Sequence, residues 1–244
     1  MIAVEALSKR FGSVQALDAV NFAAPDGAIT GILGPNGAGK TTLMRILATL
    51  LVPDAGTALV DGHDGTLDPI VVRQRFGILS DAKGLYPRLT ARENVDYFGA
   101  LYGLPHEEVS ARRDALFAQL DMDALADRRA DGFSQGEKMK TAIVRALIHD
   151  PQNVLLDEPT NGLDVIATRA MRELIRELKN AGKCVLFSSH IMQEVSAVCD
   201  RIVVLNRGRV VAAGTPADLL RTSGRATLED AFVSLLGSAA GLAA

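Results

Sequence analysis

A glycine-rich segment carries the residue types that bind phosphate groups. It reads Gly34-Pro35-Asn36-Gly37-Ala38-Gly39-Lys40-Thr41-Thr42. Glycines let backbone N–H groups turn toward a phosphate, Lys40 reaches the outer phosphate oxygens, and the Thr41 hydroxyl is a ligand for Mg²⁺. A turn that only caps a helix is the alternative. Because the segment follows an apolar run at residues 29–33 and opens a helical pattern, as a P-loop requires, we predict that it binds ATP.

Two acids end a second apolar run. The run Val154-Leu155-Leu156 leads directly into Asp157 and Glu158. Acids at a strand end often only cap the strand or keep it solvated. A P-loop, however, needs a carboxylate at the end of a neighbouring strand to hold Mg²⁺ directly or through water, and Asp157 is placed for that task. Glu158, one residue further on, is suited to polarise the attacking water.

A third polar segment, called the signature segment below, stands before a helical pattern. It reads Phe133-Ser134-Gln135-Gly136-Glu137, and apolar positions recur at helical spacing after it: Met139, Ala142, Ile143, Ala146 and Leu147. Ser134 and Glu137 match a capping box, worth about 1 kcal/mol of helix stability. A capped helix start that contains a glycine is also suited to bind a second anion. Taken alone, the segment favours the helix cap, with anion binding as the alternative.

These segments need a scaffold in which short strands alternate with helices. Strand-like runs at residues 29–33, 154–157 and 184–188 alternate with helical patterns at 39–51 and 171–178. This order predicts an α/β fold with a layered sheet.

The rest of the chain adds strands at both ends and helices in the middle. Residues 2–7 with 15–24, and 202–205 with 209–212, read as antiparallel strands, which predicts a small β-subdomain beside the main sheet. Residues 84–149 lack strand signals and predict a mostly helical insert that begins with a capping box at Thr90. Two short helices are expected within residues 215–244.

Together these motifs resemble the ATP-binding cassette (ABC) ATPases, and the resemblance covers nearly the whole chain in the family's order. The signature segment resembles the family's LSGGQ motif, Asn161-Gly162-Leu163-Asp164 its D-loop, and Ser188-Ser189-His190 its switch histidine. Phe11 resembles the aromatic residue that stacks on adenine. The resemblance implies one ABC ATPase domain over 1–244: a P-loop NTPase (RecA-like) core with an antiparallel β-subdomain (1–83 and 150–244) and an α-helical signature subdomain (84–149).

In that family two cassettes face each other head to tail around two ATP molecules. The resemblance therefore implies a second copy of the chain as partner, with Ser134 and Gly136 acting in trans on the γ-phosphate and Asp164 contacting across the interface. It also implies that His190 holds the γ-phosphate near the water activated by Glu158. Such roles suit phosphoryl transfer, which depends on positioning and on donors around the phosphate oxygens.

The sequence departs from the family's pattern at two places. Asp81 stands where the family usually has a glutamine, and a carboxylate there is a candidate ligand for Mg²⁺ through water. Phe133 and Gln135 replace a leucine and a glycine of the signature, whereas Ser134 and Gly136 are kept. We expect ATPase activity to be retained. The effect of Asp81 on the coupling between ATP hydrolysis and movement of the partner is left open.

Composition limits the partners. The 26 Lys and Arg residues are outnumbered by 29 Asp and Glu, so a nucleic-acid partner is not expected. No apolar run approaches the roughly 18 to 20 residues that cross a bilayer, and Cys184 and Cys199 form no CxxC motif. The expectation is a cytoplasmic subunit, peripheral on the inner face of the cell membrane through a separate multispan permease.

A finer resemblance concerns the transported species. Residues 84–94 look like sodium-efflux ATPases of the NatA type, and residues 228–232 like cassettes of drug and other small-molecule exporters. Leu85 and Tyr86 are candidates for the permease contact, with ordinary packing of the insert as the alternative. A soluble non-transport ABC ATPase and an ATP-binding switch without turnover are the rivals. The cargo and the permease themselves cannot be read from this sequence.

Overall fold

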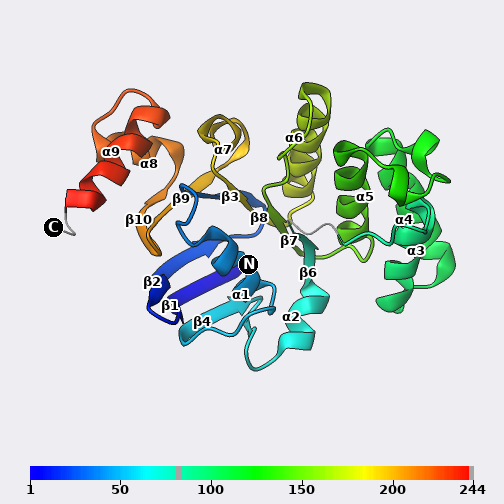
Figure 1. The fold of residues 1–244 in the computed structure, drawn as a ribbon, viewed down its shortest axis with the longest axis horizontal. Coiled ribbons are helices and arrows are strands. Elements are labelled where there is room, and N and C mark those ends of the chain that lie inside the picture. Colours follow the sequence, from blue (N-terminus) through cyan, green and yellow to red (C-terminus); the bar gives the residue numbers. More distant parts are fainter. Residues whose placement is uncertain (81–83, 242–244) are drawn as a thin grey trace.

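The computed structural model of the chain describes residues 1–80 and 84–241 and shows an α/β fold with two sheets (Figure 1). The strands are β1 Ile2–Phe11, β2 Val14–Ala24, β3 Ala28–Leu33, β4 Ala55–Val60, β5 His63–Asp64, β6 Phe76–Leu79, β7 Asn153–Asp157, β8 Cys184–Ser189, β9 Arg201–Asn206 and β10 Arg209–Gly214. The helices are α1 Lys40–Leu47, α2 Pro69–Arg75, α3 Ala91–Leu101, α4 His106–Gln119, α5 Gln135–Leu147, α6 Val165–Asn180, α7 Met192–Val198, α8 Pro216–Ser223 and α9 Leu228–Gly241. Two 3₁₀ turns, Asp123–Leu125 and Ala130–Gly132, precede α5.

A six-stranded sheet forms the centre, in the order β10-β9-β3-β8-β7-β6, and all its pairs except β9–β10 are parallel. Both faces are covered, so its middle strands are buried and mostly apolar, with polar residues mainly at the strand ends. Side chains alternate between the faces: Val185 and Phe187 of β8 pack toward α5–α7, whereas Leu186 packs toward α1. The carboxyl ends of β3, β7 and β8 therefore lie along one edge, where loops can gather functional groups.

The second sheet is antiparallel, in the order β2-β1-β4-β5, and α1 lies between it and the central sheet (Figure 1). The predicted strands at residues 2–7 and 15–24 are confirmed as β1 and β2, which pair antiparallel. The prediction for the second hairpin was only half right. Strands β9 and β10 do pair antiparallel, but β9 also pairs in parallel with β3, so this hairpin extends the central sheet.

The helices differ from their predicted bounds at two ends. Helix α1 ends at Leu47 and not at residue 51, because Thr49 adopts a left-handed conformation with φ 57°. Helix α6 begins at Val165, six residues before the predicted start, and the Asp164 carboxylate caps it by accepting from Ala167 N–H at 2.7 Å. The predicted capping boxes at Thr90 and Ser134 are both present, at the starts of α3 and α5.

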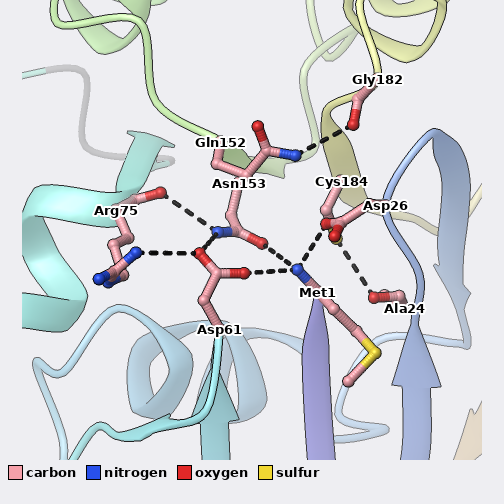
Figure 2. A network of polar contacts seen from close by, with 9 residues as sticks. All are labelled: Met1, Ala24, Asp26, Asp61, Arg75, Gln152, Asn153, Gly182 and Cys184. Atoms are coloured by element: carbon pink, nitrogen blue, oxygen red, sulfur yellow. Dashed lines mark hydrogen bonds and ion pairs between the residues drawn. The ribbon is translucent and has the colours of Figure 1, made fainter.

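A polar network joins the two sheets at the edge opposite the carboxyl ends (Figure 2). Asn153, fully buried at the start of β7, donates to the Asp61 carboxylate at 2.8 Å. Asp61 and Asp26 both accept from the α-amino group of Met1, at 2.6 and 2.5 Å. Because Asp61 follows β4 and Met1 precedes β1, these contacts fix the antiparallel sheet against the start of β7.

A candidate nucleotide site at the carboxyl ends of the strands

The P-loop follows β3 and leads into α1, and its glycines are required by its own geometry. Gly37 and Gly39 have φ angles of 77° and 107°, which side chains with a Cβ rarely adopt. A Cβ on Gly39 would also lie 2.5 Å from the Ala16 carbonyl oxygen, and one on Gly34 would lie 2.3 Å from the Leu205 carbonyl oxygen. The loop is therefore pressed against β2 and β9 with no space for side chains at these positions.

Lys40 is the first residue of α1 and its ammonium group lies inside the loop. Its Nζ donates to the carbonyl oxygens of Gly34 at 2.8 Å and Pro35 at 3.3 Å, and lies 3.8 Å from Glu158 Oε1. Burial lowers the pKa of Lys40 from its ordinary value, while Glu158 and Asp157 oppose that shift. Two of the partners of Nζ are neutral carbonyl oxygens, so a phosphate oxygen can replace a carbonyl as its partner.

Asp157 and Glu158 lie where the sequence places them, at the end of β7. Ser188, at the end of the adjacent strand β8, donates from its Oγ to Asp157 Oδ1 at 2.5 Å and accepts from the Glu158 N–H at 3.2 Å. Glu158 has φ 49°, a left-handed conformation that is uncommon for a glutamate. His190 lies just beyond β8, and its Nδ1 is 2.9 Å from Glu158 Oε2.

These groups open onto one cavity of about 440 Å³, a size that suits a small-molecule ligand. The predicted site residues that line it are Asn36, Gly37, Ala38, Gly39, Lys40, Thr41, Thr42, Asp157, Glu158 and His190. Gly34 and Pro35 are not among the lining residues but contribute the carbonyl oxygens that accept from Lys40. The cavity thus combines a cation, backbone N–H groups at a helix start and two carboxylates, a combination suited to a polyphosphate and its hydrolysis.

Several residues around the cavity were missed by the sequence reading. Val14, Gln15 and Ala16 of β2 line the cavity, as does Asn161, the first residue of the D-loop, which was given no task at this site. Nothing in the local pattern of the three β2 residues marks them, since they reach the site only because β2 packs against the P-loop. Ser188 was also given no task of its own. A polar residue that ends an otherwise apolar strand was the available signal for it.

Phe11 lies beside the cavity rather than in its lining. It ends β1, its side chain is 48% exposed, and its register partner Val14 contributes to the cavity wall. An exposed aromatic ring at the rim remains available to stack on a flat base, the task predicted for it. Lys9 Nζ lies 5.7 Å from the centre of this ring.

The remaining predicted residues do not reach this cavity within one chain. Ser134 is exposed at the start of α5, where its Oγ accepts from Glu137 N–H at 3.2 Å. A Cβ on Gly136 would meet no atom closer than Leu163 Cδ2 at 3.8 Å, so nothing in the described part of the chain requires a glycine there. Asp164 is exposed and caps α6. Ser134, Gly136 and Asp164 are absent from the cavity lining.

The residues present fit a hard cation of the Mg²⁺ type. The Thr41 hydroxyl and the Asp157 carboxylate line the same cavity, and both are oxygen donors. Among the described residues no cluster of three or more His, Cys, Asp or Glu side chains could hold a metal ion. Mg²⁺ that shares its coordination with phosphates and water needs only one or two protein ligands, so this donor set fits it. Asp81, the third predicted metal ligand, lies outside the described residues.

Fold and site together define a P-loop ATPase whose cavity combines a phosphate loop with two carboxylates at the ends of parallel strands. The sequence profile of the family described as "ABC transporter" matches residues 17–161, and the chain belongs to this family. It is an ATP-binding subunit and an ATP hydrolase of that family. Its described residues contain no helix long and apolar enough to cross a membrane.

Two curated relatives extend over most of the chain. "ABC transporter ATP-binding protein NatA" of Bacillus subtilis (strain 168) is 44% identical, over 97% of this chain and 98% of that protein. "Daunorubicin resistance ATP-binding protein DrrA3" of Streptomyces coeruleorubidus is 37% identical, over 91% of this chain and 71% of that protein.

Two solved structures share the fold. One, described as "Structure of ATP binding subunit of ABC transporter", has a TM-score of 0.90 at 31% identity and covers 96% of this chain and 99% of its own. The other is a dimeric post-hydrolysis state of the ATP-binding cassette MJ0796 bound to ADP and Pi, with a TM-score of 0.80 at 27% identity, covering 88% of this chain and 98% of its own. The predictions of an ABC cassette with an α/β fold are confirmed.

Proposed function

We propose that this chain powers export through a separate multispan membrane permease, with sodium ions as the first candidate cargo. The observation that carries the proposal is the 44% identity to NatA along nearly the full length of both proteins. The resemblance of residues 84–94 to sodium-efflux cassettes supports the same cargo.

The residues of the cavity support the following chemical step. The P-loop amides and Lys40 bind the phosphates of ATP, and Phe11 stacks on adenine. Thr41 and Asp157 would hold Mg²⁺, which would supply positive charge against the phosphates. Glu158 accepts a proton from the attacking water, and His190, in contact with the Glu158 carboxylate, holds the γ-phosphate beside it. Glu158→Gln removes the base but keeps the shape, so it should bind ATP and lose about a thousandfold in turnover. Measurement of phosphate release under multiple turnover tests this role.

The working unit in this proposal is a dimer of two identical chains. The dimeric MJ0796 cassette is similar in fold over 98% of its length, and a Cβ on Gly136 of this chain would meet no atom closer than 3.8 Å, so its own fold does not require a glycine there. Ser134, Gly136 and Asp164 of one copy would complete the ATP site of the other. In the Glu158→Gln variant, ATP should then convert monomers into dimers, which size-exclusion chromatography with light scattering detects.

An exposed aromatic pair supports a permease as the partner. Tyr86 and Tyr97 are 46% and 43% exposed, with ring centres 5.3 Å apart in an edge-to-face arrangement, and Leu85, next to Tyr86 in the sequence, packs against the core. Aromatic rings at a surface are typical of interface anchors. We expect Tyr97→Ala to weaken permease binding while the ATPase activity of the isolated chain stays unchanged.

The decisive experiment is purification from membranes. The tagged chain should sediment with the membrane fraction and co-purify with a multispan membrane protein, consistent with a peripheral subunit on the inner face of the cell membrane. A tight, salt-dependent association with nucleic acid instead would favour a soluble non-transport ABC ATPase and overturn the proposal.

Drug or other small-molecule export is the second candidate function, favoured by the 37% identity to DrrA3. Both candidate functions use the same ATP site, so the geometry of this site does not separate the two. ATP-driven sodium flux and drug flux in vesicles that carry the assembled transporter would do so. Sodium movement without drug movement supports the first candidate, and the reverse result supports the second.

A further inference from the structure

One fully buried hydroxyl links both acids of the site. Ser188 has no exposed surface, its Oγ donates to Asp157 Oδ1 at 2.5 Å, and the same Oγ accepts from the Glu158 N–H at 3.2 Å. A serine hydroxyl has one hydrogen to donate and two lone pairs to accept with. A single oxygen therefore contacts the carboxylate of one acid and the backbone of the next.

The register of the sheet produces this contact. Asp157 of β7 and Ser188 of β8 are partners in a parallel pair, so their side chains leave the sheet on the same side. Leu155 and Leu186, two residues earlier in each strand, both pack toward α1. Asp157 and Ser188 therefore project to the face where α1 and the P-loop lie.

The backbone of Glu158 adds a reason for such a contact. Its φ of 49° lies in the left-handed region, a conformation that persists only where the surroundings hold it. The Ser188 hydroxyl holds the Glu158 N–H, and His190 contacts the Glu158 carboxylate at 2.9 Å. Ser188 thus holds the backbone N–H of Glu158, the residue whose carboxylate faces the cavity.

We propose that Ser188 is a positioning residue for ATP hydrolysis. Its hydroxyl occupies one oxygen of Asp157, which leaves the other for Mg²⁺, and it holds Glu158 in the backbone conformation that presents its carboxylate to water. This inference rests on the proposed roles of Asp157 and Glu158. It also predicts that Ser188 acts on metal affinity and on turnover together, which a purely structural hydroxyl would not do.

The test compares Ser188→Ala with a matched control, Thr30→Val. Thr30 is also fully buried, on β3 next to β8, and its hydroxyl has no hydrogen-bond partner among the residues that the structure describes. Groups that orient a metal ligand typically contribute 10- to 100-fold to affinity or activity. We expect Ser188→Ala to lower kcat about 10- to 100-fold and to raise the Mg²⁺ concentration for half-maximal activity about tenfold. Thr30→Val should change neither by more than about twofold.

A readout independent of turnover is Mn²⁺ binding in the presence of ADP, followed by electron paramagnetic resonance. Ser188→Ala should weaken Mn²⁺ binding about tenfold, while ADP binding in EDTA stays within about twofold of the wild type. If Mn²⁺ affinity and kcat both match those of Thr30→Val, Ser188 has no positioning role.

Two further variants keep the test decisive. Should Ser188→Ala fail to fold, Ser188→Cys keeps a group of similar size with a weaker donor, and it should show the same changes at smaller size. A folded Ser188→Cys protein with wild-type kcat and Mn²⁺ affinity would then overturn the proposal. Glu158→Gln separates this proposal from the role of the base: if Glu158→Gln keeps full turnover, the base assignment fails, whereas the Mn²⁺ measurement still decides the role of Ser188.

Discussion

The P-loop and the signature segment both contain glycines at the start of a helix, but the surroundings of these glycines differ. At the P-loop, carbonyls of β2 and β9 stand where Cβ atoms would go, and Lys40 is already held by two carbonyls. At the signature segment, a Cβ on Gly136 would meet no atom closer than 3.8 Å, and the Ser134 hydroxyl caps its own helix. The glycines of the P-loop are therefore required by the chain's own geometry, whereas nothing in the described residues requires a glycine at position 136. In the proposed dimer, Ser134 and Gly136 of one copy would meet the ATP bound by the other copy.

The strongest test of this difference is to mix two inactive variants, one altered in the P-loop and one in the signature segment. Lys40→Ala should lose phosphate binding and Gly136→Asp should repel phosphate, each lowering ATPase activity about a thousandfold. The Asp side chain fits the fold, because a Cβ at Gly136 meets nothing closer than 3.8 Å. If sites form between chains, half of a random mixture is heterodimers with one intact site each, which restores about a quarter of wild-type phosphate release. No recovery on mixing would mean that each chain uses its own signature segment.

A smaller effect separates capping from phosphate binding at Ser134. Thr90 forms the same capping box at the start of α3, so Thr90→Ala is a matched control for Ser134→Ala. Both changes should lower the free energy of unfolding by about 1 kcal/mol, measured by urea titration. Only Ser134→Ala should also lower kcat, about tenfold or more, because it alone removes a group placed to bind charged phosphate. Equal kcat values in the two variants would leave Ser134 as a helix cap.

The smallest expected effect is on the stability of the folded protein in acid. It comes from His149, close to the end of the helix that begins at the signature segment. Burial lowers the pKa of His149, just beyond α5, to about 4, below its ordinary value of 6.5. The imidazole stacks on Tyr102 at 3.6 Å between ring centres, and its Nε2 lies 3.0 Å from the Phe76 carbonyl oxygen. Between pH 6.5 and 4, His149 binds a proton in the unfolded chain but not in the folded chain. The free energy of unfolding therefore falls as pH falls through this window.

We expect that loss to be about 1 kcal/mol between pH 7 and 5, since the group is partly solvated. His149→Gln should be less stable at pH 7 but should lose less on acidification. Urea unfolding at both pH values measures the difference. A variant that loses as much stability as the wild type would place the acid-sensitive group elsewhere.

Local patterns predicted most of the elements, and the two misjudged ones have different causes. The capping boxes at Thr90 and Ser134 involve residues three apart, so the sequence shows them directly. The start of α6 was missed because exposed Val165 and Ile166 break the apolar periodicity, although Asp164 caps the helix there. The place of β9 was misjudged because its partner β3 lies far away in the sequence.

By itself the sequence determined the phosphate loop, because glycine conformations, a lysine at a helix start and a preceding strand are all properties of consecutive residues. It also placed Asp157 and Glu158 at the end of one strand. Only the tertiary structure decided that Ser188 meets both acids and that Ser134 stays outside the cavity. The physical reason is that strand order and register bring together residues about thirty positions apart, and no local periodicity records which strands become neighbours.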